Sequence, residues 1–250
     1  DQGITSIVCS NFQGEPANLF MPVGEMFLER SVVKGVAQAT RQQLQWGAQF
    51  FDTNNDGREE LMIANGHIYD NIEQLYTGVG FAQPNTLLQF QSGKFVDIGH
   101  RAGPALEADQ VSRGLAIADF NSDGLLDFLV SNNDDRPLLG RNATTKPGNF
   151  ISIWLEGTRS NRSAIGTKIV ARVGQNKVIR EVFGGTSYLS ASDLRMHLGL
   201  GEEPHVSELD IQWPSGRVQS FRDVAGNTFY RLVEEGELEI YKPGEQIFVP

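Results

Sequence analysis

The sequence contains little cysteine, a minority of basic residues and no long apolar run. Cys9 is the only cysteine, which excludes internal disulfide bonds and zinc sites built from several cysteines. We expect its side chain to be a small buried group in a strand. No run of about 18 apolar residues and no signal-peptide pattern occur, so nothing in the sequence is predicted to span a membrane or to be cleaved.

The charge of the chain restricts its partners. Acidic residues number 31 against 21 basic ones, and the formal net charge is −10. Because no basic stripe offsets this excess, the sequence predicts no nucleic-acid partner and no anionic membrane surface, whereas cations are favoured. The 250 residues, 40% of them apolar, suffice for one large or two ordinary domains with a substantial core.

An acidic motif with the spacing D-x-N-x-D-G-x-x-D occupies residues 119–127. Ca²⁺ takes about six to eight oxygen ligands, and alternate side chains of a tightly turned loop can supply them. The glycine at the sixth position lets the chain turn with a backbone dihedral that a side chain resists. We therefore predict a calcium site in this segment, the Asp119 loop. Its predicted ligands are Asp119, Asn121, Asp123, Asp127 and the backbone carbonyl of Leu125.

The same motif occurs earlier, at residues 52–60, with glutamate in place of aspartate at the ninth position. A single Asp-Gly string is typical of an ordinary turn. Here the flanking glycine and asparagine recur at matching distances, which favours a second calcium site, the Asp52 loop. A third, degraded copy runs from Gly3 to Asn11, with Ser6 at the ninth position. The predicted ligands of the Asp52 loop are Asp52, Asn54, Asp56, Glu60 and the backbone carbonyl of Arg58.

The residues after each loop exclude an EF-hand. Its twelfth position requires a bidentate glutamate, but Ile63 and Val130 stand there. The flanks of the Asp119 loop, 115–118 and 128–130, are short apolar runs that suit strands buried on both faces. Each loop is therefore predicted to join two strands.

Strand-sized segments recur in the same order around the loops. A strand ending in asparagine is followed by one with paired leucines and by one of Gly-x-Phe or Gly-x-x-Phe type. Such four-stranded units are typical of β-propeller blades. Residues 67–80 interrupt one unit, and we expect them to form a surface loop.

The sequence pattern of the second half of the chain also predicts strands. Ile151, Ile153 and Leu155 alternate with less apolar residues, and segments 167–173 and 177–183 can pair as a hairpin. Further strands are expected in segments 194–198, 206–213 and 229–233. His197 lies in an alternating strand, and we expect a structural role for it. The pattern favours a small sandwich or barrel.

Residues 1–145 resemble the FG-GAP or VCBS type of propeller repeat, whose blades carry calcium loops of this kind. Residues 146–250 resemble an ASPIC/UnbV domain through three segments in order, NFISIWLEGTRSNRSAIGTKIVARV, REVFGGTSYLSASDLRMHLGLG and LDIQWPSGRVQSF. The resemblance implies an all-β protein in which blades of a partial propeller precede a small sandwich or barrel-like domain. Too few blades for a closed ring are present, which predicts a carboxy-terminal piece of a larger propeller. The absence of the cysteine-rich module of some animal members points to a bacterial form.

The resemblance further implies a calcium-loaded scaffold or adhesion protein, secreted or periplasmic, that binds an extracellular protein or a glycan. It brings no catalytic residues, and the sequence lacks a G-x-S-x-G elbow, an H-E-x-x-H helix and a P-loop, so no enzyme is predicted. A hydrolase using Asp134 and Asp135 is disfavoured, because adjacent acids on a polar turn are usually solvated. The alternative is a glycan-binding propeller, in which Tyr69 and Tyr76 stack on sugars.

Overall fold

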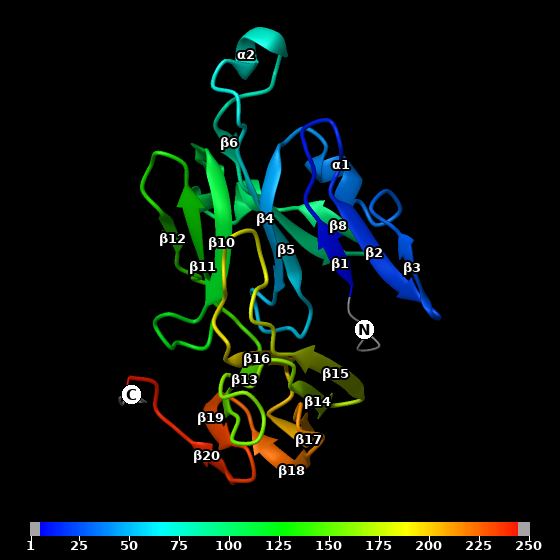
Figure 1. The fold of residues 1–250 in the computed structure, drawn as a ribbon, viewed down its shortest axis with the longest axis vertical. Coiled ribbons are helices and arrows are strands. Elements are labelled where there is room, and N and C mark those ends of the chain that lie inside the picture. Colours follow the sequence, from blue (N-terminus) through cyan, green and yellow to red (C-terminus); the bar gives the residue numbers. More distant parts are fainter. Residues whose placement is uncertain (1–5, 245–250) are drawn as a thin grey trace.

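A computed structural model describes residues 6–244, which are built mainly from β-strands (Figure 1). Three sheets precede residue 141 and two follow residue 148, and β6 (Gln83–Pro84) and β9 (Asp109–Gln110) form a further two-stranded pair. The first three sheets are antiparallel, with strands in sequence order, as in propeller blades. The predicted all-β fold, with blades followed by a small β-domain, is confirmed. Gly3 of the degraded copy lies outside the described residues.

The three blades differ in completeness. Among residues 6–244, blade 2 has four strands, and blades 1 and 3 have three each. Blade 1 consists of β1 (Ile7–Cys9), β2 (Asn18–Val23) and β3 (Met26–Glu29). Blade 2 consists of β4 (Gln45–Phe51), β5 (Glu60–Asn65), β7 (Thr86–Gln91) and β8 (Lys94–Asp97). Blade 3 consists of β10 (Ser112–Ala118), β11 (Asp127–Asn132) and β12 (Leu138–Gly140).

Short helices connect these strands. They are α1 (Val36–Thr40), α2 (Ile72–Leu75), η1 (Gly99–Arg101) and α3 (Pro104–Glu107). Helix α2 lies in the predicted insertion, which projects from the rest of the molecule at the top of Figure 1. Within the part of the chain that the structure describes, no helix is long and apolar enough to cross a membrane.

Each acidic motif occupies the hairpin between the first two strands of its blade. Phe51 pairs with Glu60 at the end of the β4–β5 hairpin, and Ala118 pairs with Asp127 at the end of β10–β11. Both hairpins have a register shift near the start of their first strand. The sequence repeat is thus also a structural repeat, with both loops at the same end of their blades.

Apolar side chains fill the spaces between neighbouring blades. Leu19, Leu61, Ile63 and Leu88 pack between blades 1 and 2. Met62, Leu87, Leu115 and Val130 pack between blades 2 and 3. Because β5 has a blade on each side, its whole length is buried.

Two expectations of burial are wrong, and both concern outer blade faces. Leu129 of β11 is 46% exposed, because no blade in the described part of the chain covers that face of blade 3. Cys9 lies in β1 as expected, but its side chain is exposed. Since its neighbour Val8 packs toward blade 2, the alternation of a strand places Cys9 on the opposite face.

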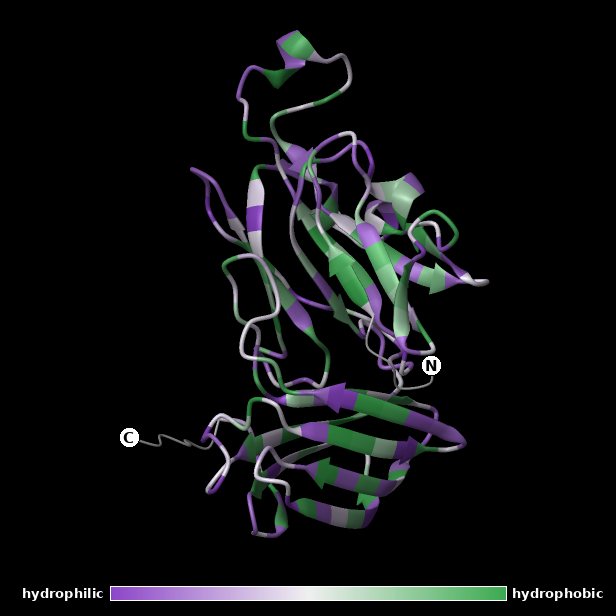
Figure 2. Cartoon of the chain, turned by 45° about the vertical axis from the view of Figure 1, so that its right-hand side comes forward, coloured by the Kyte–Doolittle hydropathy of each residue, from purple (hydrophilic) through white to green (hydrophobic). Residues whose placement is uncertain are grey.

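The C-terminal domain is a two-sheet structure around its own core. Its strands alternate apolar and polar side chains (Figure 2), and Ile153, Ile169 and Leu209 are among the fully buried ones. One sheet contains β16 (Met196–Gly201), β13 (Asn149–Glu156), β19 (Thr228–Val233) and β20 (Leu238–Ile240). The other contains β15 (Asn176–Glu181), β14 (Lys168–Val173), β17 (His205–Gln212) and β18 (Val218–Ala225). The predicted hairpin is β14–β15, whereas β18 and β20 were not predicted.

A long connection of this domain returns to the blades. Residues 183–195, which we call the inserted segment, lie against β4 and β10 (Figure 1). Ser192 Oγ accepts a hydrogen bond from the amide of Ile117 at 3.0 Å, and the amide of Asp193 donates to the carbonyl of Ile117 at 3.0 Å. The ring of Tyr188 lies 4.9 Å from that of Trp46. The segment therefore contacts the first strands of both blades 2 and 3.

We expect Gly47→Ala to destabilise the fold, because a methyl group does not fit where the inserted segment meets the blades. A Cβ at Gly47 would lie 2.9 Å from the backbone nitrogen of Leu115 and 2.9 Å from Ser187 Oγ. The free energy of unfolding, measured in urea, should fall by about 1–3 kcal/mol. Gly185→Ala is the matched control, since no atom lies within 4 Å of its added Cβ, and it should change stability by less than about 0.5 kcal/mol. Equal effects of the two changes would contradict the packing.

Candidate metal centres

The Asp52 loop is a tight turn whose carboxylates bind its own backbone. Asp52 accepts hydrogen bonds from the amides of Asp56 and Gly57, at 3.2 and 2.8 Å. Asp56 accepts one from the amide of Arg58 at 2.8 Å. Asn55 and Gly57 have left-handed backbone conformations, with φ of 60° and 83°. These contacts hold the first and fifth carboxylates to a single turn.

The Asp119 loop repeats this hydrogen-bonded frame. Asp119 accepts from the amides of Asp123 and Gly124, at 3.1 and 2.9 Å. Asp123 accepts from the amide of Leu125 at 3.0 Å, and Ser122 and Gly124 have φ of 58° and 85°. In both loops the asparagine at the third position donates to the carboxylate at the fifth, at 3.2 and 2.8 Å. The first, third and fifth predicted ligands are thus hydrogen-bonded in the same arrangement in both loops.

The ninth carboxylates are turned toward the backbone of their loops. Glu60 Oε2 accepts from the amide and hydroxyl of Thr53, at 3.0 and 2.7 Å, and Asp127 Oδ2 accepts from the amide of Phe120 at 3.2 Å. Among residues 6–244, no three His, Cys, Asp or Glu side chains are placed so that they could hold a metal ion. The structure brings the predicted ligands into one loop each, and their coordination of a metal stays a prediction.

Four of the loop carboxylates are buried. Asp52, Glu60, Asp119 and Asp127 are 5, 1, 3 and 1% exposed. Burial, together with the neighbouring charges of Asp56 and Glu60, raises the pKa of Asp52 to about 7. Burial also raises the pKa of the other three carboxyl groups. A raised pKa means that the charged form is poorly stabilised, so a cation in the loop would stabilise it.

The donor set of each loop fits a hard divalent cation. Carboxylate, side-chain amide and backbone carbonyl oxygens are the ligands of Ca²⁺, which accepts variable geometry. Neither loop contains histidine or cysteine, the ligands that favour zinc and softer metals. The seventh residues, Arg58 and Leu125, follow the turn directly and are the predicted donors of a carbonyl oxygen.

Both loops contact the C-terminal domain. The side-chain amide of Asn55 donates to the carbonyl of Gly124 at 2.9 Å, and its oxygen lies 2.8 Å from Nε2 of His197. Arg195 donates to the carbonyl of Asp119 at 2.8 Å. Burial lowers the pKa of His197 to about 3, so its ring is neutral. The histidine for which the sequence predicts a structural role therefore connects β16 to the Asp52 loop.

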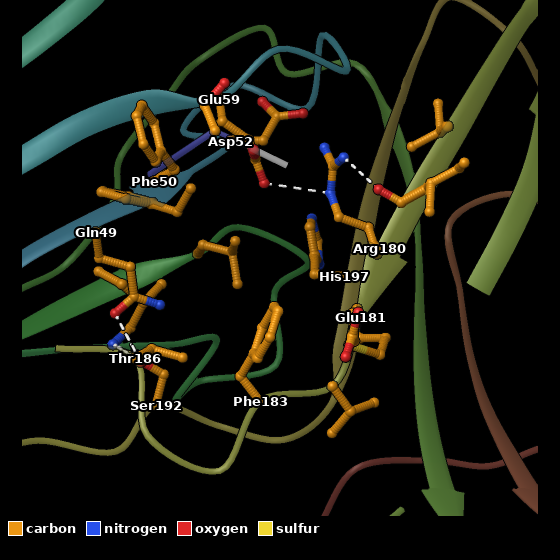
Figure 3. Close-up of a pocket in the computed structure, with 18 of the residues that line it drawn as sticks. Gln49, Phe50, Asp52, Glu59, Arg180, Glu181, Phe183, Thr186, Ser192 and His197 are labelled. Carbon is orange, nitrogen blue, oxygen red and sulfur yellow. Dashed lines mark hydrogen bonds and ion pairs between the residues drawn. The ribbon is translucent and has the colours of Figure 1, made fainter. Parts of the chain in front are cut away.

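A cleft of about 1070 Å³ lies beside the Asp52 loop, between blade 2 and the β14–β15 hairpin (Figure 3). Arg180 of β15 forms an ion pair with Glu59, with 3.2 Å between Nε and Oε1. Gln49 of β4 accepts hydrogen bonds from Ser192 and Thr186 of the inserted segment, at 2.8 and 3.2 Å. The cleft is thus bounded by direct contacts between the blades and the C-terminal domain.

Sequence reasoning missed two asparagines that support the loops. The amide of Asn142 donates to Asp127 Oδ1 at 2.7 Å, and its side chain donates to the carbonyl of Thr53 at 2.7 Å. Asn142 follows β12, and its spacing from the acidic motifs did not indicate these contacts. Asn55 occupies a variable position of the motif, but asparagine tolerates left-handed conformations better than most residues, and this preference is a usable signal.

Without calcium, the buried carboxyl of Asp52 should make the fold less stable as the pH rises. Folding raises its pKa to about 7, so the protonated group is compatible with the fold and its ionisation opposes folding. Each pH unit between the unfolded and folded pKa values corresponds to about 1.4 kcal/mol. We compare the free energies of unfolding of Asp52→Asn and of wild type, measured with urea in EDTA. The advantage of Asp52→Asn should be about 2–3 kcal/mol larger at about pH 8 than at about pH 5.

The exposed Asp135 lies outside both loops, so Asp135→Asn serves as the control and should differ from wild type by the same amount at both pH values. An Asp52→Asn difference that does not depend on pH would contradict the burial of an unbalanced charge.

Two protein families match the chain. The family described as FG-GAP-like repeat matches residues 52–130, which include both acidic loops. The family described as ASPIC and UnbV matches residues 157–239, within the C-terminal domain. The two matches lie on the two parts of the structure that the sequence assigned to these families.

Three relatives to which the chain is similar are forms of cartilage acidic protein 1. The protein of Xenopus tropicalis is 26% identical over 183 residues, which is 68% of this chain and 26% of the relative. Those of Homo sapiens and Mus musculus are 30% identical over 138 residues, 53% of this chain and 20% and 21% of the relatives. The chain therefore spans about a quarter or less of each relative. Its residues 52–130 are similar to FG-GAP-like repeats, its residues 157–239 are similar to ASPIC and UnbV domains, and the chain as a whole is similar to part of cartilage acidic protein 1.

Proposed function

We propose that both acidic loops bind Ca²⁺ and that the chain is a calcium-stabilised extracellular scaffold or adhesion module that binds a protein partner. The FG-GAP-like repeats and the ASPIC and UnbV domain support a propeller-type protein of the extracellular or interaction kind. The observation that carries the calcium proposal is the identical frame of the two loops, in which the first and ninth carboxylates are buried.

The metal acts on the fold in this proposal and takes part in no reaction. Each loop closes the hairpin between the first two strands of a blade, so repulsion among its carboxylates would loosen that hairpin. Loops of moderate affinity need about millimolar free calcium, as outside cells. We therefore place the protein in an extracellular or periplasmic setting and assign it no enzymatic activity.

The insertion at residues 67–80 favours a second candidate, glycan binding. It exposes four large side chains around α2, and aromatic rings of this kind stack on sugars. They are Ile68, Tyr69, Leu75 and Tyr76. The same apolar surface suits a protein partner, which we favour because two aliphatic side chains accompany the two rings.

Calcium should raise the melting temperature of the protein. For a dissociation constant of about 0.1 mM and about 1 mM free calcium, each site contributes about 1.4 kcal/mol. Two sites correspond to roughly 5–10 °C in a chain of this size. The Asp119 loop should bind more tightly, because Glu60 of the other loop has an extra methylene to order and is held by Thr53. Calorimetric titration and thermal unfolding with and without EGTA measure both effects.

Asp119→Ala and Asp52→Ala should each abolish one binding event, whereas Asp135→Ala should abolish none. A melting temperature that EGTA leaves unchanged, or two titrations identical to that of the wild type, would show that the loops bind no calcium.

A glycan array separates the two candidate functions. If the insertion binds a protein, as we propose, the chain should retain no glycan at micromolar concentration, and Tyr76→Ala should change nothing on the array. Retention of a defined glycan that is lost in Tyr76→Ala but kept in Leu75→Ala would instead identify a lectin.

A further inference from the structure

The Asp52 loop binds the C-terminal part of the chain through three consecutive backbone carbonyls, those of residues 53–55. The first accepts a hydrogen bond from the side chain of Asn142, the second from the amide of Gly148 and the third from the amide of Gly201. The distances are 2.7, 2.8 and 2.7 Å. Asn142 and Gly148 lie in the linker after blade 3, and Gly201 ends β16. A single turn of the loop thus holds both the linker and the domain.

The Asp119 loop is bound through the side chains of Arg195 and Asn55. Its first carbonyl accepts from Arg195 at 2.8 Å, and the carbonyl of Gly124 accepts from Asn55 of the other loop at 2.9 Å. Asn55 also contacts His197, whose ring stacks on Phe150 with 5.4 Å between centroids. Asn55 therefore connects the two loops to each other and to the C-terminal domain.

Strand β16 lies directly against a predicted ligand. A Cβ at Gly199 would stand 2.0 Å from Asp52 Oδ2, and a Cβ at Gly148 would stand 2.3 Å from the carbonyl oxygen of Asn55. Only glycine permits such close approaches of backbone. The position of the Asp52 carboxylate and the position of β16 therefore cannot change independently.

We propose that calcium in the Asp52 loop controls the docking of the C-terminal domain on the blades. This inference rests on the proposed calcium binding. The predicted ligand groups of the loop would hold the ion, while its carbonyls at residues 53–55 hold the linker and β16. Without the ion the carboxylates repel one another, and the loop relaxes where it is bound to the domain. Calcium binding in the Asp52 loop and docking of the C-terminal domain on the blades are then linked, so each favours the other.

Amide hydrogen exchange of the complete 250-residue chain, followed by NMR, tests this coupling. The amides of Gly148 and Gly201 report on it directly, because each donates to a carbonyl of the Asp52 loop. When EGTA replaces about 1 mM calcium, both amides should exchange at least about tenfold faster. Amides of β17, which pairs with β14 and β18 and not with the loops, should change by less than about twofold.

Asn55→Gly separates the coupling from calcium binding. The change keeps a residue that tolerates φ of 60° and removes the contacts to Gly124 and His197, but it removes no predicted ligand. Calorimetry should still detect two binding events. The exchange rate of the Gly201 amide should, however, rise less than about threefold when EGTA replaces calcium. Ser122→Gly makes the same change at φ of 58° in the Asp119 loop and should keep the full response.

The outcomes distinguish the two proposals. If calorimetry of the wild type detects no calcium, the proposed function is wrong and the coupling with it. If calcium binds and the amides of Gly148 and Gly201 exchange at the same rate in EGTA, the coupling is wrong and calcium binding stands. An equal loss of response in Asn55→Gly and Ser122→Gly would also overturn the coupling through Asn55.

Discussion

Negative charge buried at the ends of two blade hairpins is the constraint on which the rest of the structure depends. Asp52, Glu60, Asp119 and Asp127 are nearly inaccessible to water, and burial raises the pKa of each. Burying a carboxylate is costly unless a positive charge or several donors stabilise it. The backbone amides of each loop meet part of this need, and a divalent cation would meet the rest. A cation bound in the loops would therefore stabilise the hairpins.

The same loops join the two parts of the chain. Blade 2 and the C-terminal domain have separate apolar cores, and hydrogen bonds and an ion pair connect them. The carbonyls of residues 53–55, the side chain of Asn55 and the ion pair of Arg180 with Glu59 all belong to the Asp52 loop. Because directed polar contacts hold only when both partners keep their positions, an ordered loop is needed for an ordered interface.

The fold and the loops were largely predictable because they follow from local pattern. The spacing of acids and glycine located both hairpin turns, and alternation located β13 and the β14–β15 hairpin. Tertiary contacts were not predictable in this way. Nothing local indicates that residues 183–195 return to the blades, that His197 meets Asn55, or that Cys9 faces outward. Strand β18 was missed because its apolar positions are irregular, and β20 because it is short.

A crystal structure grown in calcium, with anomalous scattering measured at long wavelength, tests the central claim most directly. It should contain one anomalous peak in each loop, about 2.3–2.6 Å from oxygens of Asp52 and Asp119. The ninth carboxylates, Glu60 and Asp127, should have turned toward the peaks. Ordered loops without peaks at several millimolar calcium, with Glu60 still bound to the amide of Thr53, would contradict it.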